Sequence, residues 1–227
     1  MKKHESLAEF YRAKFPTLTN SLAHELGHFN VFKLDPFVGA SAKPVPYQRR
    51  DYYKISFIKG NNIIHYADKT VEIKKQALLF ANPQVPYSWE EIDKIQTGSF
   101  CVFTPSFFHE YGNLEKYAVF QSQGKPIFEL NDSQAHYIEQ LFERMFQEMA
   151  SDYVHKYDML KGLVFELIHT ALKIDPSPTI DQANYHAAKR LSLLFFEYLE
   201  RQFPIDRPSQ RMLLRSPADF ADALGVH

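Results

Sequence analysis

The chain has 227 residues, of which 45% are hydrophobic and 15% aromatic, so it can bury one large core or two small ones. Its formal net charge of −1 is far from the positive charge of a domain that binds nucleic acid unaided. No window approaches the ~18 apolar residues of a membrane span, and no apolar run follows the two N-terminal lysines, so we expect a soluble, cytoplasmic protein without a membrane partner.

Residues 1–27 are polar and irregular, and we interpret them as an N-terminal arm, either a lid or a frayed terminus. The arm runs into HELGH (His24–His28), which matches the H-E-x-x-H motif of zinc peptidases. A zinc peptidase needs both histidines on one helical face. The following HFNVFKL is strand-like instead, and Gly27 would weaken a helix by about 1 kcal/mol. We therefore interpret the match as chance, with His28 at the start of the first strand.

Residues 28–130 contain short runs rich in Tyr, Phe, Ile and Val, separated by turn residues. This pattern predicts a small β-barrel or sandwich. The segment KGNN at 59–62 is interpreted as a hairpin turn, because glycine and asparagine tolerate positive φ. Cys101, the single cysteine, has no partner for a disulfide or a metal site, and we expect it to be a small core residue.

The hydrophobic period becomes helical after residue 130. Apolar residues recur every three or four positions from Ile138 to Met149, and Asp132 or Ser133 is available as the N-cap. A second apolar stripe follows the short connection SDYVHK, which predicts an antiparallel helical hairpin over 131–174. The stripes either cover the sheet or form the seam of a homodimer. The residues expected in the seam are Leu160, Val164, Leu167 and Ile168.

Two prolines in IDPSPTID end the helical pattern, so residues 175–179 are expected to be a linker. A third helix is predicted over 180–203. A last short helix is predicted to begin with Ser216 as its N-cap and Pro217 at the first helical position, which is the favoured arrangement.

The order of these segments resembles the AraC-type transcription regulators, in which a small cupin barrel precedes a helical hairpin, a linker and a helical DNA-binding domain. The resemblance is carried by RRDYYKISFIKGNNIIHYADKTVEI, ALLFANPQVPYSWE, GSFCVFTPSFF and LRSPADFADALGVH. In the last segment Ala221 is small where two helices of a helix-turn-helix would cross, and Gly225 suits the left-handed turn. An ordinary helix capped by glycine is the alternative.

The resemblance implies an α+β chain with a cupin-like barrel (a double-stranded β-helix) over 28–130, a dimerisation hairpin over 131–174 and an incomplete AraC-type DNA-binding domain over 180–227. The chain ends at His227, where the recognition helix is expected. We therefore expect no DNA-binding residue in this chain, which is either a piece of a longer regulator or a shortened form.

A metal site is not expected in the barrel. Metal-binding cupins hold their ion with histidines and a carboxylate, but the matching positions here carry Gln48, Arg50, Lys54 and Tyr87. Because two cationic side chains would repel a metal ion, we expect no metal and no cofactor. A metal-dependent cupin enzyme, an oxygenase or isomerase, is the alternative function, and no other pattern predicts catalytic residues.

The same positions suggest a site for a small ligand. Arg50, Tyr52 and Lys54 alternate along one strand and would line the barrel mouth if their face points inward; the alternative is an exposed sheet face. Two cations and a phenol suit a carboxylate or another anion, which arginine can bind through two hydrogen bonds. Further candidates, each with a structural role as the alternative, are Tyr87, Trp89, His28 and Asn30.

We therefore expect the effector-binding and dimerisation portion of an AraC-type regulator. A small ligand in the barrel would shift the N-terminal arm and the hairpin between two arrangements, and so control DNA binding by a C-terminal helix-turn-helix domain that is truncated here. A coupling of about 1–3 kcal/mol is typical of such systems, so modest ligand contacts would be enough.

Overall fold

The computed structural model describes residues 5–14, 28–37, 45–48, 50–66, 69–83, 85–93, 95–108, 114–121, 124–175, 187–202 and 211–225. The chain divides into two compact units, residues 1–177 and 178–227. The division falls inside the segment that we expected to be a linker. No helix in the ranges above is both long and apolar enough to cross a membrane.

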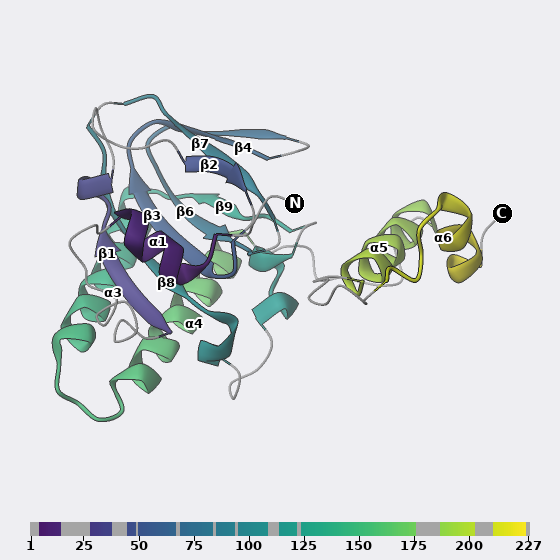
Figure 1. The fold of residues 1–227 in the computed structure, drawn as a ribbon. Helices are drawn as coiled ribbons and strands as arrows, with labels where there is room; N and C mark the ends of the chain where they lie inside the picture. The colour runs from purple at the N-terminus through teal and green to yellow at the C-terminus, as the bar shows by residue number, and fades with distance from the viewer. Residues whose placement is uncertain are drawn as a thin grey trace. The chain divides into compact units, whose positions relative to one another are not determined.

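The first unit is built on two antiparallel sheets (Figure 1). The strands are β1 (Phe29–Lys33), β2 (Val45–Gln48), β3 (Tyr53–Lys59), β4 (Asn62–His65), β5 (Thr70–Ile73), β6 (Gln76–Ala81), β7 (Tyr87–Glu91), β8 (Thr97–Phe103) and β9 (Ile127–Glu129). One sheet has the order β1-β8-β3-β6-β9 and the other the order β2-β7-β4-β5. The chain passes repeatedly from one sheet to the other, which is the arrangement of a double-stranded β-helix. The predicted α+β class with a cupin-like barrel is confirmed.

The turn at KGNN joins the two sheets. Gly60 adopts a φ of 136°, as a turn glycine is expected to do. However, β3 pairs with β6 and β8, whereas β4 pairs with β5 and β7. The prediction of a turn is confirmed and that of a hairpin is wrong. Glycine and asparagine mark a change of direction, but they do not specify which strand pairs with which.

A helical hairpin, α3 (Asp132–Ala150) and α4 (Lys156–Ile174), covers the outer face of the five-stranded sheet (Figure 1). The N-cap of α3 is Asn131 rather than Asp132 or Ser133. The Asn131 side chain accepts from the Gln134 backbone N–H at 2.9 Å, and the Gln134 side chain accepts from the Asn131 N–H at 2.9 Å. This reciprocal pair satisfies two backbone donors at once, which explains why the helix begins at this point.

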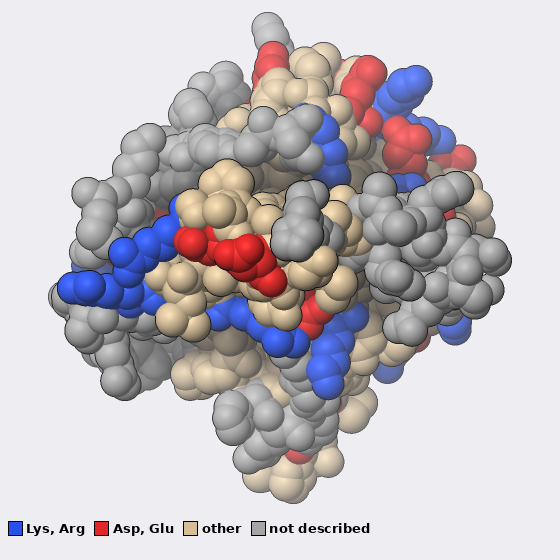
Figure 2. Space-filling model, turned by 90° about the vertical axis from the view of Figure 1, so that its right-hand side faces the viewer, with Lys and Arg blue, Asp and Glu red and all other residues tan. Residues whose placement is uncertain are grey.

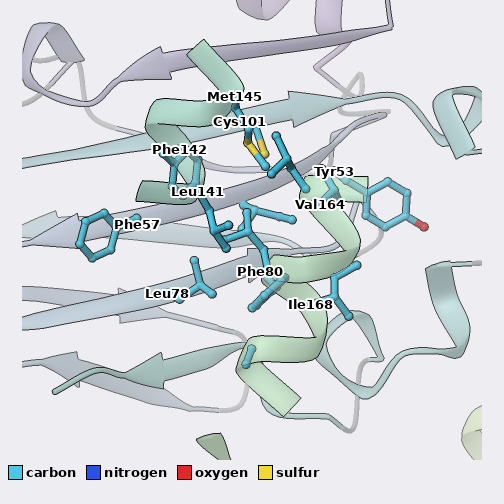
Figure 3. Close-up of a cluster of buried hydrophobic side chains, with 14 of the residues drawn as sticks. Tyr53, Phe57, Leu78, Phe80, Cys101, Leu141, Phe142, Met145, Val164 and Ile168 are labelled. Carbon is cyan, nitrogen blue, oxygen red and sulfur yellow. The ribbon is translucent and has the colours of Figure 1, made fainter. Parts of the chain in front are cut away.

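The helices and the sheet enclose a core that we call the helix-side core. Figure 3 shows its labelled side chains: Tyr53, Phe57, Leu78, Phe80 and Cys101 from the sheet, Leu141, Phe142 and Met145 from α3, and Val164 and Ile168 from α4. Cys101 is fully buried, and burial raises the pKa of its thiol to about 12. Its predicted place in the core is confirmed.

The four residues expected in a dimer seam lie in this same core. Leu160, Val164, Leu167 and Ile168 are each 0% exposed within the single chain. Side chains buried against their own sheet cannot contact a partner subunit, so the alternative role of the stripe, covering the sheet, is the one observed. The prediction was wrong because both roles need the same apolar period.

The start of the chain contains a folded helix, α1 (Leu7–Lys14), in place of the expected irregular arm. The Ser6 hydroxyl accepts from the Glu9 N–H at 3.1 Å, and the Glu9 carboxylate accepts from the Ser6 N–H at 2.9 Å. One face of α1 packs between the two sheets, in what we call the inter-sheet core, through Leu7, Phe10 and Tyr11. Both His24 and Glu25 of the peptidase-like motif lie outside the described residues.

The second unit contains α5 (Ala187–Glu200) and α6 (Pro217–Leu224). Ser216 caps α6, Pro217 is its first residue, and Gly225 ends it in the left-handed conformation, with a φ of 66°. These predictions are confirmed. The rings of Phe195 and Phe220 lie 4.7 Å apart and join the two helices.

Candidate functional site

A charged and phenolic cluster lies in the inter-sheet core. Arg50, Tyr52 and Tyr87 are 6%, 2% and 3% exposed. The Arg50 guanidinium carbon lies 4.6 Å from the centre of the Tyr87 ring, and Arg50 Nε lies 3.4 Å from Glu5 Oε2. The Tyr52 hydroxyl donates to the same carboxylate oxygen at 2.9 Å. We call these four residues the Arg50 cluster.

Backbone contacts hold the two parts of the cluster in register. Glu5 and Arg50 form a parallel β-bridge, and the Asp51 N–H donates to the Glu5 carbonyl at 3.1 Å. The Leu7 N–H in turn donates to the Asp51 carboxylate at 2.8 Å. The residues that lead into α1 are therefore attached directly to the residues that lead into β3.

In the cluster as it stands, the charge of Arg50 is balanced by the Glu5 carboxylate. Burial lowers the pKa of Arg50, but Tyr87, Tyr52 and Glu5 outweigh it and hold that pKa above its ordinary value. Burial, followed by the Glu5 charge, raises the pKa of Tyr52, so this phenol keeps its proton and remains a hydrogen-bond donor. The Arg50 cation and the Tyr52 phenol both lie against one carboxylate oxygen of Glu5, an arrangement that matches the hydrogen-bonding needs of a carboxylate.

Three other predicted residues share the inner face of the barrel. Lys54 Nζ lies 4.2 Å from the centre of the Phe100 ring, which belongs to the inter-sheet core. Trp89 packs against the same core. Asn30 is 8% exposed, alternates with the helix-side residues of β1, and accepts from the Val31 N–H at 2.9 Å.

His28 lies outside this group. Its side chain is exposed, with Nδ1 at 3.0 Å from the Thr104 hydroxyl and 3.1 Å from the Ser106 hydroxyl. The residue precedes β1, which begins at Phe29, so the alternation that we extended back from Asn30 does not reach it. In the structure His28 has the alternative, structural role.

Several buried polar atoms lack a hydrogen-bond partner within the described parts of the chain, among them the Ser56 hydroxyl and the Trp89 indole nitrogen. Ser56 is 1% exposed and lies in β3 beside Leu79 and Phe100 of the inter-sheet core. Because native proteins leave few buried polar atoms unpaired, such atoms mark a place where a ligand or an ordered water is accommodated.

A small cleft adjoins the cluster. Its volume is about 40 Å³, and its lining includes Tyr87 together with Tyr66, Lys69 and Phe120. This is room for about three water molecules, since about 10–15 Å³ on this scale holds one.

Sequence reasoning missed Glu5 and Ser56. A local pattern for α1 was present, because Ser6-Leu-Ala-Glu9 matches the S-x-x-E capping box and Leu7, Phe10 and Tyr11 follow at helical spacing. Nothing local indicated that Glu5 would meet Arg50, 45 positions further along the chain. Ser56 lay on the predicted inward face of its strand, but serine is equally common on exposed faces.

The residues at the expected metal-ligand positions do not fit a cation. Arg50 and Lys54 both lie on the inner face, and Arg50 contacts Tyr87. The backbone of Gln48 pairs with that of Tyr87, whereas the Gln48 side chain lies outside the described part. Among the residues that the structure describes, no three His, Cys, Asp or Glu side chains are grouped as a metal ion requires.

Of the comparisons with known proteins, the one with solved structures found similar chains. No protein-family model matches the chain, and no curated protein matches its sequence. One similar solved structure is ToxT from Vibrio cholerae, at 13% identity and a TM-score of 0.40, with 88% of this chain and 71% of ToxT covered.

Two further matches carry informative descriptions. Wild-type ToxT bound to an unsaturated fatty acid is 15% identical, with a TM-score of 0.38, over 88% of this chain and 69% of that one. An RmlC-like cupin protein with a double-stranded β-helix fold, from Methanocaldococcus jannaschii, is 19% identical, with a TM-score of 0.26, over 34% of this chain and 68% of that one. Matches this distant assign no ligand; the cupin-like fold of this chain rests on its own strand order.

Proposed function

We propose that this chain is the effector-binding and dimerisation part of an AraC-type transcription regulator that acts in the cytoplasm. A small carboxylate bound at the Arg50 cluster controls DNA binding by a C-terminal helix-turn-helix domain. The observation that carries the proposal is a buried arginine between the sheets of a cupin-like barrel, with two phenols beside it and a carboxylate already paired to it. A buried guanidinium requires such a partner, and carboxylates match its geometry.

The order of the units supports a regulator rather than an isolated binding protein. The barrel is followed by the hairpin α3–α4 and then by a separate helical unit. In that unit α6 ends at Gly225 in the left-handed conformation, as the first helix of a helix-turn-helix does. On the face shown in Figure 2, basic and acidic side chains of the described residues are interspersed.

We also propose a homodimer, but its contact surface is not the buried apolar stripe of α4. Large apolar side chains are exposed around the connection between α3 and α4 and at the start of α4: Tyr153 (54%), Val154 (85%), Tyr157 (38%) and Met159 (43%). Exposed apolar residues gathered in one place are typical of protein contact surfaces. The contact is therefore assigned to this end of the hairpin and not to the buried stripe.

The ligand class is tested by thermal unfolding and calorimetry of the chain with hexanoate, and with hexanamide as its uncharged counterpart. We expect hexanoate to raise the melting temperature in proportion to ln(1 + [L]/Kd), and hexanamide to have little effect. The variant Arg50→Met should lose the response. The control variant Arg144→Met also removes a positive charge, but at a half-exposed position on α3. This variant should keep the response to hexanoate. An equal response in both variants would contradict binding at the cluster.

The dimer surface is tested by sedimentation velocity of the double variant Val154→Asp/Met159→Asp. We expect a monomer with an unchanged melting temperature in dilute solution, because both side chains are exposed. A wild-type chain that is monomeric at all accessible concentrations would contradict this part of the proposal.

A further inference from the structure

We propose that Glu5 is a built-in competitor of the ligand: its carboxylate occupies the place on Arg50 and Tyr52 that the ligand carboxylate takes, so that binding releases α1 from the barrel. The inference rests on the proposed function, because it assumes a carboxylate ligand. To the proposed function it adds a mechanism of regulation, displacement of Glu5 and α1, and a narrower class of ligand.

The geometry makes the two carboxylates exclusive. Glu5 Oε2 accepts the Tyr52 hydroxyl at 2.9 Å and lies 3.4 Å from Arg50 Nε. One oxygen therefore engages both the cation and the phenolic donor. Arg50 is 6% exposed, and a second carboxylate in this buried site would face the Glu5 charge at short range in a low dielectric. A ligand carboxylate therefore binds to Arg50 only after Glu5 has left.

Departure of Glu5 is coupled to α1. The carboxylate belongs to the residue before Ser6, which caps α1, and the Glu5 carbonyl accepts from the Asp51 N–H at 3.1 Å. The Leu7 N–H, in the first turn of α1, donates to the Asp51 side chain at 2.8 Å. A shift of Glu5 away from Arg50 thus pulls on the hydrogen bonds that join the start of α1 to Asp51, before β3.

The space that α1 would vacate determines the rest of the ligand. Leu7, Phe10 and Tyr11 are buried at 6%, 5% and 1% exposure. The Phe10 ring lies 5.4 Å from the Tyr52 ring and 6.2 Å from the Phe100 ring. A small hydrophilic acid such as acetate would replace the carboxylate but leave this apolar volume unfilled. The ligand class is therefore a monocarboxylate with an apolar body, which refills the inter-sheet core that α1 leaves.

The first test compares hexanoate affinity between the wild-type chain and Glu5→Gln by calorimetry. If Glu5 occupies Arg50 in nine molecules of ten, its removal tightens binding about tenfold, because the apparent Kd scales inversely with the competent fraction. Glu72→Gln, an exposed change of the same kind in β5, should leave the affinity unchanged. Ser6→Ala weakens α1 but keeps Glu5, so an equal gain in Ser6→Ala and Glu5→Gln would overturn a specific role of the carboxylate.

The second test uses the unaltered chain, so it holds even if Glu5→Gln is poorly folded. Amide hydrogen exchange is measured with and without saturating hexanoate. We expect faster exchange in residues 7–14 on binding, with α4 unchanged as the internal control. Slower or equal exchange in α1, with hexanoate bound, would overturn displacement and show that α1 closes over the ligand.

The outcomes separate the two proposals. Hexanoate binding that requires Arg50 but is equal in wild type and Glu5→Gln leaves the proposed function standing and overturns the competition. Absence of hexanoate binding in both proteins overturns the ligand class, and with it the competition. Tighter binding in Glu5→Gln together with faster exchange in α1 supports both.

Discussion

The two faces of the five-stranded sheet carry cores of different character. On the outer face, α3 and α4 cover an apolar helix-side core (Figure 3). On the inner face, the inter-sheet core contains Arg50, the one charged side chain that is buried among the described residues. It also contains the Ser56 hydroxyl, which has no hydrogen-bond partner among those residues. A long, well-packed helical hairpin covers one face, whereas an eight-residue helix fills part of the other.

The chemical difference between the two cores suits them to different roles, one in stability and the other in the proposed exchange of Glu5 for a ligand. Apolar side chains in close-packed layers stabilise one arrangement without needing partners of a particular chemistry. Buried charges and unpaired hydroxyls are costly in isolation, and their cost falls when a suitable partner arrives. The helix-side core therefore needs no further partner, whereas the proposed exchange of Glu5 for a ligand involves the inter-sheet core.

The largest expected effect is the loss of packing in the helix-side core. Leu167→Ala should lower the free energy of unfolding by about 2–5 kcal/mol, because it leaves a cavity under a fully buried side chain. Lys173→Ala, at an exposed position of the same helix and outside the proposed dimer surface, should change it by about 0.5 kcal/mol or less. Urea unfolding at several protein concentrations measures both. An effect of Leu167→Ala that disappears at low concentration would assign the residue to a dimer contact instead.

The next effect concerns the ion pair of the inter-sheet core. In a double-mutant cycle, Arg50→Met and Glu5→Gln should show a coupling of about 1–3 kcal/mol, because each single change leaves the other group buried without its partner. Glu5 is 19% exposed, which places the value below that of a fully buried pair. Chemical unfolding of the four proteins gives the coupling. Additive effects would show that the two groups do not interact in solution.

A matched pair of small substitutions on neighbouring strands sharpens the comparison. Ser56→Ala on the inner face should raise the free energy of unfolding by about 1 kcal/mol, because it removes an unpaired hydroxyl. Cys101→Ser on the helix side should lower it by about 1–3 kcal/mol, because it places a hydroxyl in an apolar core. Thermal unfolding of both variants tests the pair. A destabilised Ser56→Ala would show that water or a ligand pairs with Ser56.

The smallest effect lies at the exposed start of α3. Hydrogen bonds from Lys75, then from Gln76, lower the pKa of Asp132, so its carboxylate stabilises the fold above the ordinary carboxyl pKa and loses that contribution as pH falls through the lowered value. Asp132→Asn should therefore be slightly less stable than the wild type at neutral pH. The difference should shrink below about pH 4. Melting temperatures measured from pH 7 to pH 3 test this, and a constant difference would contradict it.

Local patterns predicted much of this fold correctly. Alternating aromatic and β-branched runs indicated the strands, the three-to-four spacing indicated the hairpin, and Ser216 with Pro217 marked the start of α6. Arg50 and Tyr52 do lie toward the inner face as predicted, but they precede β3, which begins at Tyr53, so only Lys54 of the three belongs to the strand. These features follow from backbone geometry over a few residues, which the sequence displays directly.

Local sequence patterns did not predict which distant segment covers a helix face or pairs with a strand. The stripe with Leu160 and Leu167 suited a dimer seam as well as a core, and only the neighbouring sheet determined that it is buried within the chain. The KGNN turn was visible, but the pairing of β3 with β6 and β8 depends on the whole strand order.

The sequence by itself determined an α+β chain with a strand-rich part, an amphipathic hairpin and a capped final helix, because those depend on spacing and on turn and cap chemistry. It also indicated that two cations and a phenol, Arg50, Lys54 and Tyr52, were available for an anion. The tertiary structure alone decided that Glu5 meets Arg50, since the contact joins segments 45 positions apart and requires α1 to lie between the two sheets. Burial of that pair in a low dielectric turns an ordinary glutamate into a candidate competitor of the ligand.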